Sequence, residues 1–206
     1  MDSKISWFIS DTLMEMIKNG IGVEFVNKHE IQFDNDNPLT GCAGYFCHHE
    51  RQLKICFSKI KLEQWLGNYI HEYCHFLQWK MNSPKWTRCE ELEQITDYDS
   101  WLSGDIEYNK RQLDTRTTSM QLMELEAEKW AVDIINKFKL PINTDTYIRK
   151  ANVYILGYRI ALDKRKWFTQ STSQPEVLKE APNTFIKSVK NVPTKLYKTI
   201  EQYCFS

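Results

Sequence analysis

Hydrophobic residues recur at helical spacing in three long stretches of the chain. Residues 4–18 and 61–80 each carry an apolar stripe with a period of about 3.6 residues, and the first stretch ends at Asn19-Gly20, a typical helix stop. Residues 145–166 show the same periodicity. We therefore predict a helix over each of these three ranges.

A fourth helix is predicted from a start signal. Thr118-x-x-Gln121 resembles a capping box, in which two side chains satisfy the free amides of a first helical turn. Apolar positions at helical spacing continue from there to Lys139, just before Pro141. The pattern predicts a helix over about 119–139.

Shorter extended runs lie before the second helix. Residues 21–26 and 30–33 have the composition of strands, and the segment 34–38 is typical of a loop. Residues 42–58 contain two extended runs separated by His49-Glu50-Arg51-Gln52, which indicates a hairpin. We predict a small sheet ahead of the helix over 61–80.

Together these elements predict an α+β fold in one main domain. A small, mostly antiparallel sheet would pack on the helix over 61–80 and on the helix over 119–139. Residues 84–116 are polar and interrupted by Pro84 and Gly104, with one short helix around 90–95, so we interpret them as an insertion. The predicted domain covers 1–170, and residues 171–206 form a C-terminal helical extension packed on it.

Composition and charge narrow the function classes. Hydrophobic residues make up 42% of the 206 residues, which is typical of a folded globular chain. Lys+Arg and Asp+Glu balance at 27 each, so the charge gives no indication of a nucleic acid or membrane partner. The N-terminal segment has no signal-peptide core and no stretch reaches spanning length, so we expect a cytoplasmic protein. The six cysteines contain no Cys-x-x-Cys pair, and we expect them to be reduced and mostly buried.

The strongest chemical signal lies on the second helix. His71-Glu72-Tyr73-Cys74-His75 forms an H-E-x-x-H motif. Positions i and i+4 differ by about 40° around a helix axis, so both imidazoles can bind one ion. Glu72 lies about 100° from His71, where it can take a proton from a water molecule instead of binding the same ion. The motif predicts His71 and His75 as metal ligands and Glu72 as the general base.

The two histidines lie away from the apolar stripe of their helix, which consists of Leu62, Trp65, Leu66, Tyr69, Ile70, Tyr73, Phe76 and Leu77. A histidine that served only as core packing would lie within that stripe. The alternative to a metal site is therefore a solvated polar face.

A third ligand must come from elsewhere, because catalytic zinc usually keeps three protein ligands and one open position. Glu124 is the candidate, since it projects from within the apolar stripe of the helix over 119–139, beside Ala131. The alternative is a glutamate that extends into solvent at the helix edge. Glu126 is placed less well to bind a metal, whereas Glu128 could accept a hydrogen bond from a ligand histidine.

The string from Glu124 to Ala131, E-L-E-A-E-K-W-A, resembles the E-x-x-A-(D/N/E)-x-(F/W)-A signature of gluzincin-type metallopeptidases, including the ImmA/IrrE-like group. The resemblance covers about residues 40–135 and implies a zincin-like fold, a Zn²⁺ cofactor, Glu124 as the third ligand and Glu128 as a supporting acidic residue. Residues 150–167 are also similar to metallopeptidases encoded by large phages, which implies a host-cytoplasmic or virion location. The separation between His75 and Glu124 is longer than in the compact members of the group.

These features predict a zinc-dependent endopeptidase acting on a polypeptide substrate. The metal would polarise the scissile carbonyl and lower the pKa of its bound water to about 7. Tyr154 and Tyr158 are candidate donors to the developing oxyanion, although tyrosines at helical spacing more often pack in a core. Residues 52–58, if they form the sheet edge, could hold an extended peptide by strand addition.

Three other readings stay open. The chain could be a catalytically silent zincin-fold protein with a binding or virion-associated structural role, or a regulatory protease of narrow specificity. Cys42-x4-Cys47-His48, completed by His49 or Cys56, could form a structural zinc site, but its spacing is loose. Oligomeric state is not indicated by the sequence.

Overall fold

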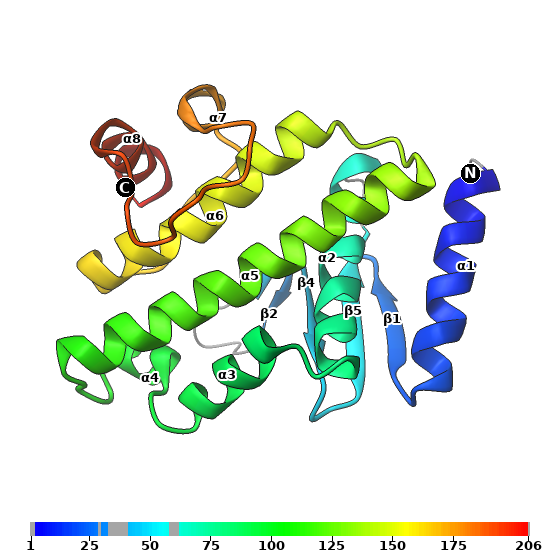
Figure 1. Ribbon diagram of the computed structural model, residues 1–206, viewed down its shortest axis with the longest axis horizontal. Coiled ribbons are helices and arrows are strands. Elements are labelled where there is room, and N and C mark those ends of the chain that lie inside the picture. Colours follow the sequence, from blue (N-terminus) through cyan, green and yellow to red (C-terminus); the bar gives the residue numbers. More distant parts are fainter. Residues whose placement is uncertain (1–2, 29, 33–40, 58–61, 206) are drawn as a thin grey trace. The chain divides into compact units, whose positions relative to one another are not determined.

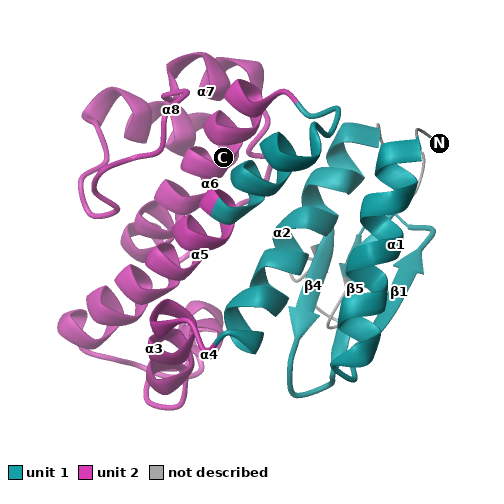
Figure 2. Ribbon diagram, turned by 45° about the vertical axis from the view of Figure 1, so that its right-hand side comes forward, with its two compact units in different colours: residues 1–81, 130–142 teal, residues 82–129, 143–206 magenta. Residues whose placement is uncertain are grey.

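The computed structural model describes residues 3–28, 30–32, 41–57 and 62–205. The chain divides into two compact units (Figure 2). Unit 1 contains residues 1–81 and 130–142, and unit 2 contains residues 82–129 and 143–206. The predicted division at residue 170 stays a prediction. None of the described helices is both long enough and apolar enough to span a membrane.

Unit 1 contains all of the described strands and the helix with the H-E-x-x-H motif, which is labelled α2 in Figure 1. Its elements are α1 (Ser3–Lys18), β1 (Gly22–Val26), β2 (Ile31–Gln32), β3 (Gly41–Cys42), β4 (Gly44–Cys47), β5 (Gln52–Cys56), α2 (Leu62–Lys80) and the last nine residues of α5 (Lys110–Phe138). The predicted helices over 4–18 and 61–80 and the hairpin within 42–58 are confirmed. The predicted loop at 34–38 lies outside the described residues.

The three-stranded sheet has the order β1-β5-β4 and is mixed, so the prediction of a mostly antiparallel sheet was wrong. β4 and β5 form the antiparallel hairpin, while β1 runs parallel to β5. A parallel pair requires a long crossover connection, and alternation within a strand carries no information about which distant strand it will join. β5 is therefore the central strand, and β4 lies at the edge.

One face of this sheet packs on α2. Gly44 and Phe25 both stand opposite Ile55 in the strand register, and Phe46 stands opposite Leu53, so these side chains share a face. Leu53 and Ile55 are fully buried. Glu24 and Lys54 are also directly opposite each other, but on the other face, where they form an ion pair of 3.3 Å. The alternation along β5 thus decides which side of the hairpin faces the motif helix.

Aromatic contacts fix α2 against the sheet and against α1. Phe46 on β4 packs edge-on against Phe76, with ring centroids 6.0 Å apart. Phe8 on α1 packs edge-on against Tyr69, and the Tyr69 hydroxyl shares a hydrogen bond of 2.6 Å with Thr12. These contacts hold the apolar stripe of α2, and the histidine side of the helix does not take part in them.

All the secondary-structure elements described in unit 2 are helices. It contains α3 (Pro84–Glu93), α4 (Tyr98–Ser103), the first twenty residues of α5, α6 (Thr144–Lys164), α7 (Pro175–Glu180) and α8 (Thr194–Cys204). α6 confirms the predicted helix over 145–166, and α7 and α8 pack on it as the predicted C-terminal helices. Most of residues 84–116 belong to α3, α4 and the start of α5, so they contain more helix than the sequence indicates, and their interpretation as an insertion stays a prediction.

The predicted start of α5 was wrong by about eight residues. The helix begins at Lys110, where the amide of Gln112 donates to Asn109 Oδ1 and the amide of Asn109 donates to Gln112 Oε1. This reciprocal pair is the capping box. Thr118 lies inside the helix, and its hydroxyl donates to the carbonyl of Asp114 at 2.6 Å.

The short helix predicted over 90–95 was also misplaced. α3 starts at Pro84, and Ser83 caps it by accepting from the amide of Lys85. Proline at the first helical position is a start signal, because its missing N–H would have had no partner there. Pro84 is thus the start of a helix, and its interpretation as an interruption is wrong.

Candidate metal centre

The two motif histidines of α2 converge within unit 1. His71 Nε2 and His75 Nε2 are 3.1 Å apart, and the two rings meet edge to face with centroids 4.6 Å apart. This is the geometry expected for residues i and i+4 of one helix. The sequence prediction that both imidazoles face the same point is confirmed.

Gln78 fixes the orientation of the second histidine. His75 Nδ1 lies 2.8 Å from Gln78 Oε1. An amide oxygen can only accept a hydrogen bond, so Nδ1 carries the proton and Nε2 keeps its lone pair. Ligand histidines in metal sites usually have such an acceptor on the second ring nitrogen.

The nitrogen pair fits a metal ion. Zn–N bonds measure about 2.0–2.1 Å, so two nitrogens on a tetrahedral zinc ion lie about 3.4 Å apart. The observed 3.1 Å is close to that separation. Two imidazoles and a carboxylate form a donor set that zinc accepts readily.

The histidine side of α2 is not a solvated polar face. His75 is 6% exposed, Glu72 is 9% exposed and Gln78 is fully buried. Polar groups are buried at a cost unless they have partners, so this face is built around polar contacts. The solvated-face alternative was therefore wrong.

Glu72 lies next to the edge strand. A Cβ atom added at Gly44 of β4 would lie 3.5 Å from Glu72 Cγ, and it would clash with Lys54 O at 2.9 Å. Glycine at position 44 therefore lets β4 run close to both β5 and the glutamate. Burial raises the pKa of the neighbouring Cys42 thiol to about 12, and the negative charge of Glu72 adds to that rise.

Glu124 lies on α5 within unit 2 and is 5% exposed, so the alternative of a glutamate that extends into solvent is wrong. The hydroxyl of Tyr158 donates to Glu124 Oε1 at 3.3 Å. Tyr154 is the next member of this chain, with its hydroxyl oxygen 3.1 Å from that of Tyr158. Burial raises the pKa of Tyr158 well above its ordinary value of 10, so its hydroxyl stays protonated and can donate.

The other two glutamates of this stretch of α5 differ in their surroundings. Glu128 is 7% exposed, and its predicted role as an acceptor for a ligand histidine stays a prediction. Glu126 accepts a short hydrogen bond from the hydroxyl of Ser83, the cap residue of α3. Its carboxylate thus has a structural partner within unit 2.

His71, His75 and Glu124 form a group that could hold a metal ion, each through one ligand atom. Another such group among the described residues is His48, His49 and Glu90, in which no residue is buried. Neither group includes a cysteine. The described part of the chain therefore does not support the structural zinc site at Cys42 and Cys47. All six cysteines are free thiols, and four of them are buried.

The sequence interpretation missed two supporting residues, Gln78 and Gly44. Gln78 lies three positions after His75 on the same helix, and this spacing could have identified it as a partner for the ring. Gly44 had no local signal, because its role depends on the pairing of β4 with β5.

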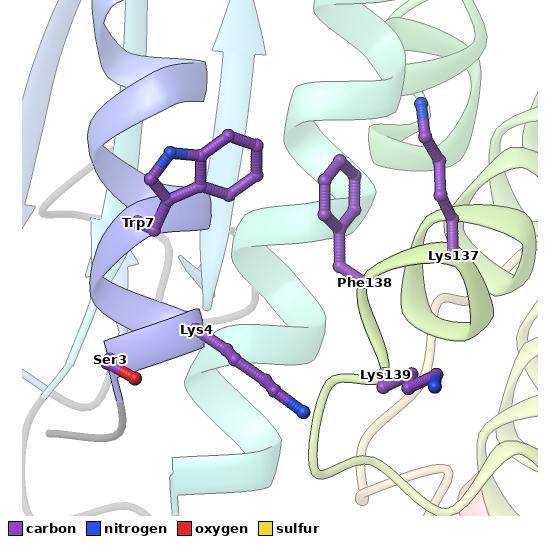
Figure 3. Close-up of a pocket in the computed structure, with 6 residues that line it drawn as sticks. All are labelled: Ser3, Lys4, Trp7, Lys137, Phe138 and Lys139. Carbon is purple, nitrogen blue, oxygen red and sulfur yellow. The ribbon is translucent and has the colours of Figure 1, made fainter.

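A separate open pocket lies elsewhere in unit 1, between the start of α1 and the end of α5 (Figure 3). It measures about 480 Å³ and is lined by Ser3, Lys4, Trp7, Lys137, Phe138 and Lys139. Trp7 and Phe138 are in tilted contact, with centroids 5.6 Å apart. None of the predicted site residues lines this pocket.

No protein-family model, curated protein or solved structure matches this chain. The candidate centre therefore depends on its own geometry and on the chemistry of its side chains.

Proposed function

We propose that the chain is a zinc-dependent peptidase in which His71, His75 and Glu124 hold the metal ion. The observation that carries this proposal is the convergence of the two Nε2 atoms at 3.1 Å, with the proton of His75 held on Nδ1 by Gln78. A helix that served only as scaffold would have no need to orient an imidazole in this way. Zinc bound there would act as a Lewis acid toward a carbonyl oxygen and make water a stronger acid.

Glu72 is the proposed general base. It follows His71 directly on α2, so its side chain leaves the helix about 100° away from that ligand. Its carboxylate takes the proton of the attacking water and delivers it to the leaving amine. The reaction then needs no covalent intermediate on the protein.

The edge strand β4 is the proposed binding site for the peptide backbone. The sequence suggests this role for residues 52–58, but β5 is paired on both sides and has no free edge. β4 lies at the edge and passes beside Glu72 at Gly44. An extended peptide added there would bring its carbonyl groups to the base, which favours a polypeptide over a small molecule as substrate.

Peptide hydrolysis can be tested without a known substrate. Purified wild type, loaded with one equivalent of zinc, is incubated with a proteome-derived peptide library, and new termini are read by mass spectrometry. The matched control is Glu72→Gln, which keeps the shape of the side chain but cannot take a proton. We expect cleavage by wild type only, lost with chelator and restored by zinc.

Absence of new termini with the zinc-loaded wild type would refute a general endopeptidase. It would leave the two alternatives, a protease for one specific protein and a zinc-holding binding protein. Equal cleavage by wild type and Glu72→Gln would remove Glu72 from its proposed role.

A further inference from the structure

The hydroxyl of Tyr158 donates a hydrogen bond to the carboxylate of Glu124. Tyr158 is 8% exposed and its Oη lies 3.3 Å from Glu124 Oε1. A carboxylate only accepts, so the single hydroxyl proton of Tyr158 points to Glu124. The oxygen of Tyr158 then accepts from the hydroxyl of Tyr154 at 3.1 Å. The result is a directed chain of two phenols that ends on one oxygen of the glutamate.

The ring of Tyr158 is fixed by aromatic neighbours on the same helix and just beyond its end. Tyr154 packs against it edge-on at 5.5 Å, and Trp167 does so at 4.8 Å. Trp167 reaches this position because Arg165 ends α6 in the left-handed conformation and reverses the chain. The next residue, Phe168, stacks on Tyr154 with centroids 6.2 Å apart.

Glycine at position 157 is part of the same arrangement. A Cβ atom there would lie 1.9 Å from Phe168 Cζ, so only glycine admits this ring against the helix. Phe168 in turn packs on Phe205 near the C-terminus, at 4.8 Å. The phenol chain is therefore held by a packed cluster and is not a pair of mobile side chains.

We propose that Tyr158 is a positioning residue for the metal ligand Glu124. Its hydroxyl holds Oε1 and thereby orients the carboxylate, so that Oε2 is offered to the ion. Tyr154 strengthens this hold by donating to the Tyr158 oxygen. This inference rests on the proposed function, and it assigns Tyr158 a role other than the oxyanion donor expected from the sequence.

Zinc affinity of the apo-protein tests the inference without any activity measurement. The dissociation constant is measured by competition with a chromophoric chelator for wild type, Tyr158→Phe, Tyr154→Phe and Glu124→Gln. Loss of a hydrogen-bond partner of a metal ligand typically weakens metal binding by about 10–100-fold. We expect a loss in that range for Tyr158→Phe and a smaller loss for Tyr154→Phe.

Tyr197→Phe is the matched control. It also removes a tyrosine hydroxyl that donates to a carboxylate in unit 2, here Asp163 at 3.2 Å. We expect its zinc affinity to equal that of wild type. The unfolding of each metal-free variant is monitored by circular dichroism. This measurement separates a loss of folding stability from a loss of zinc affinity.

The outcomes separate the two proposals. If Glu124→Gln binds zinc as tightly as wild type, the proposed function fails. If Glu124→Gln loses zinc but Tyr158→Phe does not, only the positioning role is wrong, and the same holds if Tyr158→Phe lowers stability alone. Should Tyr158→Phe not fold, an unchanged affinity in Tyr154→Phe would overturn the inference.

Discussion

Replacement of Gly157 by alanine tests how tightly the aromatic cluster packs on α6. The added methyl group would lie 1.9, 2.6 and 2.8 Å from three atoms of the Phe168 ring. That ring has Trp167 at 5.0 Å and Phe205 at 4.8 Å behind it, so it has little room to move. Overpacking of this kind costs about 1–3 kcal/mol, and the overlap here indicates the upper part of that range.

The same substitution also brings a gain, because alanine is a better helix former than glycine by about 1 kcal/mol. We therefore expect Gly157→Ala to lower the free energy of unfolding by about 1–2 kcal/mol. In a Phe168→Ala background the clash is absent and only the helix gain remains. There Gly157→Ala should raise the free energy of unfolding by about 0.5–1 kcal/mol.

The test is a double-mutant cycle. Urea unfolding is monitored by circular dichroism for wild type, both single variants and the double variant. The coupling between the two positions should be about 2–3 kcal/mol, and the sign of the Gly157→Ala effect should reverse between backgrounds. If Gly157→Ala stabilises the wild-type protein, the close packing of Phe168 on the glycine is refuted.

Substitutions at two further positions test other parts of the structure. Gln78→Leu removes the acceptor for His75 Nδ1 and should weaken zinc binding by about 10–100-fold, while Gln78→Glu keeps an acceptor and should stay close to wild type in chelator competition. Equal affinities for the leucine and glutamate variants would contradict that role. The ammonium of Lys190 and, to a smaller extent, the guanidinium of Arg159 lower the pKa of Asp114 below its ordinary value of 3.8. The ionised carboxylate therefore stabilises the folded protein above pH 3.8, and this stabilisation is lost as the pH falls through the folded-state pKa of Asp114. Asp114→Asn should therefore unfold at lower urea than wild type at pH 7, and a gap that does not narrow as the pH falls below 3.8 would show that charge is not the cause.

Local patterns in the sequence were sufficient to predict the helices that carry the proposed metal ligands. The apolar stripe of α2 and the i, i+4 spacing of its histidines led directly to the observed convergence of His71 and His75. Glu124 was identified because a carboxylate within an apolar stripe needs a partner, and Tyr158 is such a partner. These inferences need only one helix at a time.

Features that depend on tertiary pairing could not be predicted in this way. β1 pairs with β5 in parallel, and this pairing leaves β4 as the edge strand. The hairpin sequence alone does not indicate which of its two strands lies at the edge. Competing start signals on one helix were also ambiguous. Asn109 and Gln112 match the capping-box pattern as well as Thr118 and Gln121 do. Gln121 does not cap a helix, because its side-chain amide donates to the carbonyl oxygen of Ile155 at 2.7 Å within unit 2.

Zinc stoichiometry tests the proposed metal site most directly. Elemental analysis is applied to wild type, Glu124→Ala, Glu128→Ala and Glu72→Gln after dialysis against a weak chelator. We expect about one zinc ion per chain in wild type and in Glu72→Gln, loss of the metal in Glu124→Ala, and a reduced content in Glu128→Ala if that residue supports a ligand histidine. Full occupancy in Glu124→Ala would contradict the assignment of the third ligand, and a wild-type protein that binds no zinc would contradict the metallopeptidase proposal itself.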